Sequence, residues 1–192
     1  MVSQAERREA TIRAICASAR KLFGARGFAA TTIDEIAAQA GVAKGAVYHH
    51  FPSKEDVFAR VLENVQEELA TGQMVAPRKQ HASIDQIAAG VSRYLAAVSQ
   101  PEIRQILLID GPAVLGWLKW REIDMRYFGA LTKGALSLAL PPNTPQREVD
   151  ALAHLLMGAV MEAALLCATS KDAKKAAREL TAALHRLLHG LA

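Results

Sequence analysis

Residues 31–55 read TTIDEIAAQAGVAKGAVYHHFPSKE, and this stretch decides the fold of the N-terminal region. Thr32 stands before an apolar helical pattern and Glu35 follows three residues later, which is the spacing of a capping box. Gly41 predicts the end of this first short helix. A second helix of about two turns is expected over residues 43–50, where a proline two residues later stops it. Two short helices joined by a tight turn predict a helix-turn-helix.

The second short helix is too short and too polar to contribute much to a hydrophobic core, but its length and side chains suit a DNA major groove. Val47 and Phe51, four residues apart, can anchor one face of it to the neighbouring helices. Lys44, Tyr48 and His49 then face outward. We therefore expect this helix to be the part of the chain that reads DNA.

Small residues in the same helix favour a close approach to DNA. Gly45 removes a side chain at a point where the backbone can approach a phosphate. The methyl group of Ala43 or Ala46 can touch a thymine methyl, and Lys44 can reach O6 or N7 of guanine. These few candidate base contacts do not define an operator sequence.

The stretch closely resembles the DNA-binding domain of the TetR family of bacterial regulators. The resemblance rests on Gly27-Phe28, on residues 31–37 and on residues 41–55, and it extends over about residues 8–68. It implies that residues 8–68 form a DNA-binding domain. It also implies that a divergent all-helical remainder, residues 69–192, binds a small ligand and dimerises.

The resemblance further implies which residues contact operator DNA. Thr32 and Lys54 would contact phosphates from helix N-termini, although a plain helix cap is the alternative role for Thr32 and both roles are expected to hold. For His50, packing inside the domain and DNA contact both stay open. Ala43 and His49 depart from the commonest family pattern, which has Ser or Thr and a second Tyr there. The predicted DNA-binding residues are Thr32, Lys44, Gly45, Ala46, Tyr48, His49 and Lys54.

Beyond this region the apolar spacing stays helical, and no run shows the strict alternation of a half-buried strand. The sequence therefore predicts an all-α fold of about nine helices. Pro101 is expected to start a helix that ends before Gly111 and Pro112, and a long helix is expected over residues 113–140. The last two helices, over about 145–169 and 171–189, are joined by very few residues and should be antiparallel neighbours.

The last two helices are the expected dimer interface. The first of them is apolar nearly all round, which is typical of a helix buried on more than one face. The second adds leucines on one face and basic residues on the other. Two such helices per chain can form a four-helix interface, as the resemblance also implies. Two-fold symmetry would then place two reading helices on one face of the homodimer.

Aromatic residues concentrate over residues 108–128, beside several charged residues. Ordinary core packing and a ligand cavity are about equally supported for any single residue, but for the region as a whole we prefer a pocket. Methionines on the following helix would serve as adaptable apolar liners. The predicted effector is a small apolar or amphipathic molecule. The candidate ligand-binding residues are Trp117, Trp120, Arg121, His154, Met157 and Met161.

Charge and composition agree with these expectations. Residues 1–54 hold eight Lys or Arg against four Asp or Glu, whereas residues 55–192 hold fifteen of each, so the positive excess lies at the N-terminal end and suits a polyanion. Cys16 and Cys167 lie far apart among apolar neighbours, as reduced thiols do. The strongly apolar stretch 151–161 is too short to span a bilayer. We expect a soluble, cytoplasmic protein with no membrane partner.

An enzyme is the first alternative, but the motifs that would support one are missing from the sequence. It has no glycine-rich phosphate loop after a strand, no Gly-x-Ser-x-Gly elbow and no cysteine pair at metal spacing, and no cofactor is expected. His185 and His189 are four residues apart and could share a metal, but no third ligand is evident. They are better explained as the basic end of a helix. The closer alternative is a DNA-binding protein with a filled C-terminal core that senses no small molecule.

Overall fold

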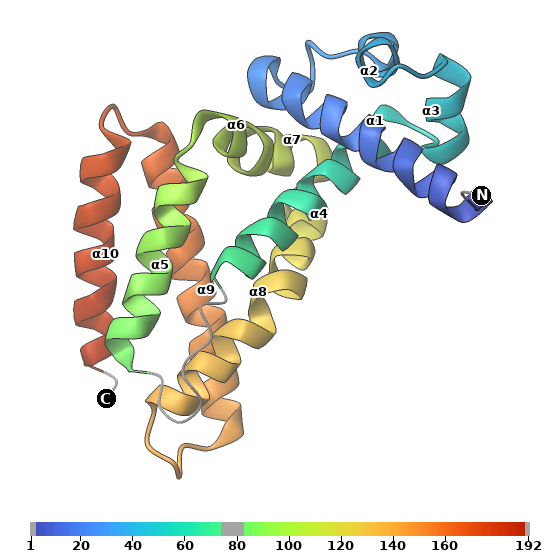
Figure 1. Cartoon of the computed structure of the whole chain (residues 1–192). Coiled ribbons are helices and arrows are strands. Elements are labelled where there is room, and N and C mark those ends of the chain that lie inside the picture. Colours follow the sequence, from blue (N-terminus) through green and yellow to red (C-terminus); the bar gives the residue numbers. More distant parts are fainter. Residues whose placement is uncertain (1–2, 74–82, 191–192) are drawn as a thin grey trace. The chain divides into compact units, whose positions relative to one another are not determined.

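The computed structural model describes residues 3–73 and 83–190, and within these ranges every regular element is helical (Figure 1). The predicted all-α fold is therefore confirmed. Contacts between Cα atoms divide the chain into two compact units. Unit 1 comprises residues 1–65 and 101–120, and unit 2 comprises residues 66–100 and 121–192. The boundary predicted near residue 68 stays a prediction, but residues 101–120 group with the N-terminal region.

Unit 1 is built around the helix-turn-helix. Its core is apolar, with Phe23, Ile36, Val47 and Phe58 fully buried. The rings of Phe23 and Phe58 meet edge to face with centroids 5.3 Å apart, an arrangement that aromatic pairs prefer. Its helical segments are α1 (Gln4–Arg26), α2 (Ile33–Ala40), α3 (Lys44–His50), the first part of α4 (Lys54–Gln73), α6 (Pro101–Arg104), the π-helical η1 (Gln105–Asp110) and α7 (Gly111–Leu115).

The ends of α2 follow directly from the sequence. Thr32 and Glu35 form the predicted capping box, in which each side chain accepts a hydrogen bond from the other residue's backbone N–H. Gly41 follows the last turn with φ +69°, a left-handed conformation that glycine adopts without steric cost. These local signals fix where α2 ends and where the turn into α3 begins.

The structure corrects the prediction for residues 101–140. The helix from Pro101 does not end before Gly111 but continues through η1 into α7. Pro112 occupies the first turn of α7, the part of a helix in which proline is most readily accommodated. The break falls instead at Gly116, whose φ of +77° leaves the helical region, and α8 (Trp117–Ala139) begins directly after it.

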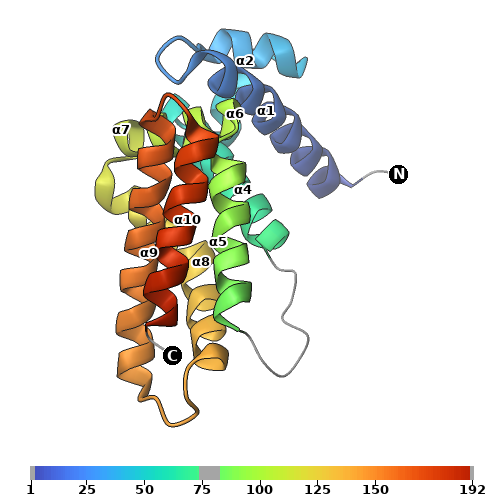
Figure 2. The ribbon, with the colours of Figure 1, turned by 90° about the vertical axis from the view of Figure 1, so that its left-hand side faces the viewer.

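Unit 2 is a helical bundle. It contains the rest of α4, α5 (Ile84–Val98), most of α8, α9 (Gln146–Thr169) and α10 (Ala173–His189). The predicted antiparallel pairing of the last two helices is observed, and α5 packs against both of them (Figures 1 and 2).

Helix α9 spans Gln146–Thr169, close to the predicted range of 145–169, and is strongly apolar. With 24 residues and a mean hydropathy of 1.8 in its most apolar window, it is long and apolar enough to cross a bilayer, although 39% of that window is buried inside the protein. A single helix of this kind is weak evidence for a membrane span, since core helices have the same length and composition. Leu155 and Leu166 on this helix are exposed, and so is Leu187 on α10.

Candidate DNA interface and effector region

Helix α3 presents the predicted residues to solvent. Val47 is fully buried and Phe51 nearly so, which fixes the inner face of the helix as expected. Lys44 and His49 are exposed, and Tyr48 keeps 47% of its surface in solvent. A large aromatic side chain left open on a short helix costs favourable burial unless a partner covers it. This face of α3 is therefore open to solvent, as the predicted DNA contact requires.

Lys44 has an internal partner in the free protein. Its Nζ lies 2.9 Å from Oδ1 of Asp34 on α2, and hydrogen bonding to this carboxylate raises the pKa of Lys44. Both side chains are more than half exposed, so water and salt weaken the pair. A phosphate or a guanine edge can therefore compete with Asp34 for the ammonium.

Gly45 and His50 differ in what surrounds them. A Cβ added to Gly45 would meet no atom within 4 Å, so internal packing does not require glycine there. His50 is half-buried, and its Nδ1 has no hydrogen-bond partner among the described residues. Burial, followed by the positive charges of His49 and Arg8, lowers the pKa of His50. A neutral, partly packed His50 favours the packing interpretation over a phosphate contact.

Thr32 combines an exposed position with a cap. Its Oγ1 accepts the N–H of Glu35 at 3.3 Å, and Glu35 accepts the N–H of Thr32 at 2.9 Å. Arg26 also donates to Glu35 at 2.9 Å, and this bond is the largest cause that lowers the pKa of Glu35 to about 2. The N-terminus of α2 is thus held in shape at the surface, where a phosphate could bind.

Lys54 has a structural role that the sequence did not reveal. Its Nζ donates to the carbonyl oxygens of Phe28 and Thr31, both at 2.9 Å, and lies 4.1 Å from the centre of the Phe28 ring. An ammonium has three donors, so one is left for the predicted phosphate contact. The acceptors are backbone atoms more than 20 residues away in the chain, and no sequence motif predicts such a contact.

Segment η1 contacts the same loop, and α6 contacts the helix before it. Oδ2 of Asp110 accepts the N–H of Phe28 at 2.8 Å, and Arg20 on α1 donates to Glu102 at 2.6 Å. The loop between α1 and α2 is therefore fixed by Lys54 at its carbonyls and by Asp110 at an N–H. Because the loop leads directly to Thr32, these two residues set where α2 begins.

The two predicted tryptophans differ in exposure. Trp117 is mostly exposed, whereas Trp120 is fully buried, and their ring centroids lie 5.1 Å apart. The indole Nε1 of Trp120 has no hydrogen-bond partner among the described residues. An unpaired buried N–H is rare in folded proteins. Both residues belong to unit 1.

The other predicted ligand-binding residues lie in unit 2. Met157 and Met161 on α9 are buried, whereas His154 is exposed and its Nδ1 lies 2.8 Å from the carbonyl oxygen of Asp150. Arg121 donates to Asp124 at 2.9 Å. The hydrogen bonds of His154 and Arg121 therefore go to residues of their own helices, and the predicted ligand contacts stay a prediction.

A polar group that sequence reasoning did not assemble lies inside unit 2. This buried polar cluster consists of Gln66 on α4, Tyr94 on α5, and Arg121 and Asp124 on α8. Asp124 is only 4% exposed, and burial, opposed by Arg121, raises its pKa to about 6. Burial also raises the pKa of Tyr94, and the charge of Asp124 adds to that shift. In the sequence, only Gln66, a polar residue at a core position of α4, could have indicated this cluster.

Gln66 leaves an acceptor unused in this cluster. Its Nε2 donates to Oδ1 of Asp124 at 3.5 Å, a long bond. Its Oε1 is buried without a partner among the residues that the structure describes. An unpaired buried carbonyl costs roughly 1–3 kcal/mol, so a bound donor group would be favoured here.

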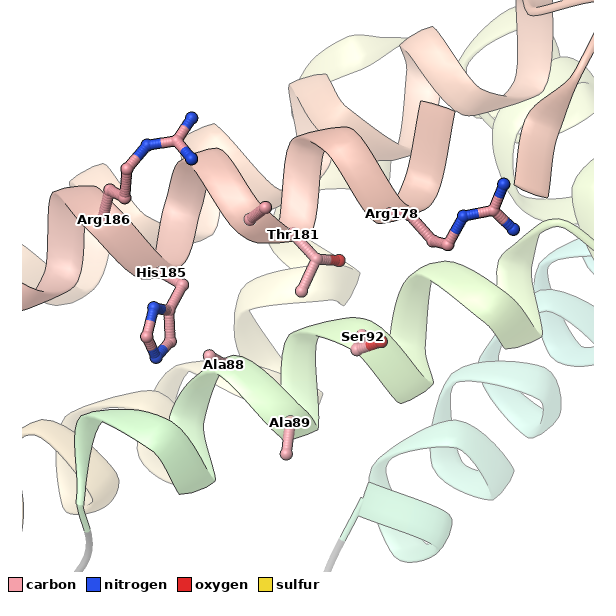
Figure 3. Close-up of a pocket in the computed structure, with 8 residues that line it drawn as sticks. Ala88, Ala89, Ser92, Arg178, Thr181, His185 and Arg186 are labelled. Carbon is pink, nitrogen blue, oxygen red and sulfur yellow. The ribbon is translucent and has the colours of Figure 1, made fainter. Parts of the chain in front are cut away.

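A groove of about 430 Å³ opens between α5 and α10 in unit 2 (Figure 3). The groove is a different place from the predicted effector region, because none of the predicted ligand-binding residues lines it. Figure 3 shows Thr181 and His185 projecting from α10 toward α5, whereas Arg186 points away from α5. The lining residues are Ala88, Ala89, Ser92, Arg178, Thr181, Ala182, His185 and Arg186.

Two family models match the chain in separate regions. Residues 15–61 match the model described as "Bacterial regulatory proteins, tetR family". Residues 84–191, more than half of the chain, match the model described as "Tetracyclin repressor-like, C-terminal domain". The first match covers α2, α3 and parts of α1 and α4, and the second covers the helices from α5 onward.

Individual proteins show the same likeness. A crystal structure of a TetR-family transcriptional regulator from Pectobacterium atrosepticum is 30% identical, with a TM-score of 0.80 over 98% of this chain and 97% of that one. The Transposon Tn10 TetC protein of Escherichia coli is 25% identical over 170 residues, covering 88% of this chain and 86% of its own. The repressor KstR2 of Rhodococcus jostii is 43% identical over 51 residues, which is 27% of this chain and 25% of its own length.

Proposed function

Because the chain belongs to the TetR family of bacterial regulatory proteins, we propose that it is a homodimeric repressor that a small ligand releases from its operator. Its relatives are DNA-binding transcriptional regulators and not enzymes. The observation that carries the proposal is α3, whose fully buried Val47 fixes an outward face with an exposed Tyr48. A cytoplasmic location belongs to the proposal, because such a regulator must reach DNA.

In the proposed complex, α3 lies in the major groove. Tyr48 and His49 face the groove, and Ala46 lies against it beside Gly45, where the helix backbone comes nearest to the DNA. The N-termini of α2 and α4 bind phosphates through Thr32 and through the free donor of Lys54. Lys44 exchanges Asp34 for DNA on binding.

The DNA proposal is tested in two steps. Selecting bound fragments from random double-stranded DNA should return a palindromic sequence with half-sites about 34–36 Å apart. Tyr48→Ala should then weaken binding to that sequence by at least tenfold while circular dichroism stays unchanged. Lys175→Ala removes an exposed lysine of α10 and serves as the control. Equal affinity for the parent and for Tyr48→Ala would refute the proposed role of α3.

The proposed dimer forms through α9 and α10. Leu155 and Leu166 on α9 are separated by about three helical turns and lie on one face, and Leu187 is exposed on the neighbouring α10. Large exposed leucines on neighbouring helices cost burial in a monomer and favour a self-complementary interface.

The proposed effector is amphipathic, and the buried polar cluster selects its polar end. Oε1 of Gln66 and the carboxyl of Asp124 can both pair with hydroxyl or amine hydrogens, while neighbouring apolar side chains hold the rest. The fold alone does not determine which ligand binds, because proteins of similar fold have been solved with very different ligands. Examples are RolR with resorcinol and a FadR from Bacillus subtilis with stearoyl-CoA. Trp117, Trp120, Arg121, His154, Met157 and Met161 stay in the proposal as candidate contacts.

A regulator that senses no small molecule is the competing proposal. It would share the DNA interface and use the buried polar cluster only as internal structure. Thermal denaturation across a library of metabolites and drugs separates the two proposals. A compound that raises the melting temperature of the parent and not of a Gln66→Leu variant supports an effector site.

A further inference from the structure

Three side chains from opposite parts of the chain meet at one point in unit 2. Asp85 lies in the first turn of α5, and His185 and His189 lie in the last turns of α10. Nε2 of His185 lies 2.7 Å from Oδ1 of Asp85, and Nε2 of His189 lies 3.3 Å from the same oxygen. The two Nε2 atoms are 3.1 Å apart. The histidine pair lacked a third partner in the sequence, and α5 supplies it.

The separations between these three atoms match a metal site. Zinc binds histidine nitrogen at roughly 2.0–2.1 Å and carboxylate oxygen at roughly 2.0–2.2 Å, so two ligands of a tetrahedral ion lie about 3.3 Å apart. The observed separations of 2.7, 3.1 and 3.3 Å are close to that value, and one ion can reach all three atoms. The three potential ligand atoms all lie within 4.8 Å of one another.

Hydrogen bonds alone do not account well for the convergence. If both rings carry a proton on Nε2, both N–H groups point at the same oxygen of Asp85, and the two donor nitrogens are crowded together at 3.1 Å. If one ring loses that proton, it has no donor for the carboxylate. A cation between the three atoms removes this conflict, because every one of them then acts as an electron-pair donor.

We propose that Asp85, His185 and His189 form a binding site for a divalent transition metal, with zinc as the best-matched ion. Two imidazoles and a carboxylate suit zinc, whereas magnesium and calcium prefer sets of oxygen ligands. The protein supplies three ligands, so a fourth coordination position stays open to water or to a small ligand. His185 also lines the groove between α5 and α10, so that position has access to the groove (Figure 3).

The site has a mechanical consequence for unit 2. The metal would tie the first turn of α5 to the last turn of α10. On α10, His185 and His189 lie roughly 160° around the helix from Leu187. The metal site and the proposed dimer surface are therefore on opposite faces of this helix, and both can be occupied together.

Isothermal titration of the full chain, without an affinity tag and treated with chelator, tests the site with ZnCl₂ as the probe. About one zinc ion per chain should bind and raise the melting temperature, and MgCl₂ should do neither. Asp85→Asn should weaken zinc binding about tenfold or more, and His185→Gln should remove it. Glu179→Gln on the same helix and His154→Gln on α9 are matched controls that should bind zinc like the parent.

Loss of zinc binding must be distinguished from loss of folding. Circular dichroism of each metal-free variant must match that of the parent before its titration is interpreted, and Asp85→Ala is titrated beside Asp85→Asn as a second variant. Absence of zinc binding by the parent at millimolar concentration overturns the site. Equal affinity for the parent and for both Asp85 variants overturns the three-ligand arrangement, even if the histidines still bind zinc.

Discussion

At Gly45, the residue that would stabilise the helix most is not the one that lets DNA come closest to the backbone. Glycine inside a helix is less stable than alanine by about 1 kcal/mol, and the free protein has open space for the missing side chain. Gly45→Ala should therefore raise the unfolding free energy by up to about 1 kcal/mol. If DNA approaches the backbone here, the same change should weaken operator binding about tenfold or more.

Gly134 on α8 provides the control for this substitution, because a Cβ there also meets no atom within 4 Å. Gly134→Ala should stabilise the protein similarly in urea unfolding without changing its DNA affinity. A Gly45→Ala variant that keeps full operator affinity would show that glycine is not needed for DNA to approach.

At Asp124, burial makes stability depend on pH. Because its pKa is raised from 3.8 to about 6, the folded protein holds a proton between these pH values that the unfolded chain has released. Stability from this group is therefore full below about pH 4 and is lost as pH rises through 6, by on the order of 3 kcal/mol. Asp124→Asn cannot titrate and should lack this change.

Urea unfolding of the parent and of Asp124→Asn at pH 4.5 and pH 7.5 measures the effect, since other titrating groups cancel in the comparison. The parent should gain stability relative to the variant on acidification. A constant difference between the two proteins would mean that the carboxyl titrates normally and that the cluster is not desolvated.

At the scale of elements, the contact between η1 and the loop before α2 is the link that we expect to matter most. Asp110 accepts the N–H of Phe28, and the loop leads to Thr32. Asp110→Ala leaves this N–H without its acceptor and should cost about 1 kcal/mol of stability. It should also weaken operator binding, because the N-terminus of α2 loses its fixed position.

Asp110→Asn keeps an oxygen that can accept the same hydrogen bond and should restore much of both losses. Fluorescence anisotropy with labelled operator, beside urea unfolding, separates the two effects. Operator affinity in Asp110→Ala equal to that of the parent would show that η1 supports the fold but does not position the DNA interface.

The sequence analysis predicted best those elements whose ends are determined by neighbouring residues. Thr32, Glu35 and Gly41 act within a few residues of one another, so α2 and the turn after it could be read directly. The break between α7 and α8 was misplaced because Gly111 and Pro112 were treated as terminators, whereas Pro112 fits the first turn of a helix.

The contacts that sequence analysis missed join residues that are distant in the chain. Lys54 meets backbone carbonyls of another segment, Asp110 lies 82 residues from Phe28, and Asp85 lies 100 residues from His185. Which polar groups meet across such separations depends on how the helices pack. The spacing of apolar residues predicts which helix faces are buried, but it does not predict which polar side chains contact one another. The histidine pair on α10 was noticed, but its third partner required the fold.

At the scale of the whole molecule, dimer formation is the first expectation. Leu187→Glu places a charge on an exposed position of α10, so the monomer should fold normally while the dimer weakens by several kcal/mol. Leu184 is buried inside the chain and is unsuitable for this test, because a charge there would disturb the monomer itself. Sedimentation velocity of the parent and of Leu187→Glu measures the change, with the exposed Arg186→Glu as the control for added charge. An undisturbed dimer would move the interface away from this surface.

The last expectation is coupling between effector and operator in the dimer. A ligand changes DNA affinity only if it binds more tightly to the state whose two α3 helices no longer match the half-sites. A loss of affinity of roughly 5- to 150-fold is ordinary for such coupling, and operator must weaken ligand binding by the same factor. Both directions can be measured with one compound found by thermal denaturation, using operator anisotropy and ligand titration. Gln66→Leu should lose the response while keeping operator affinity, whereas Glu67→Gln, exposed on the same helix, should keep both. Equal ligand affinity with and without operator would show that the compound binds without regulating, and the regulator that senses no small molecule would then describe this protein better.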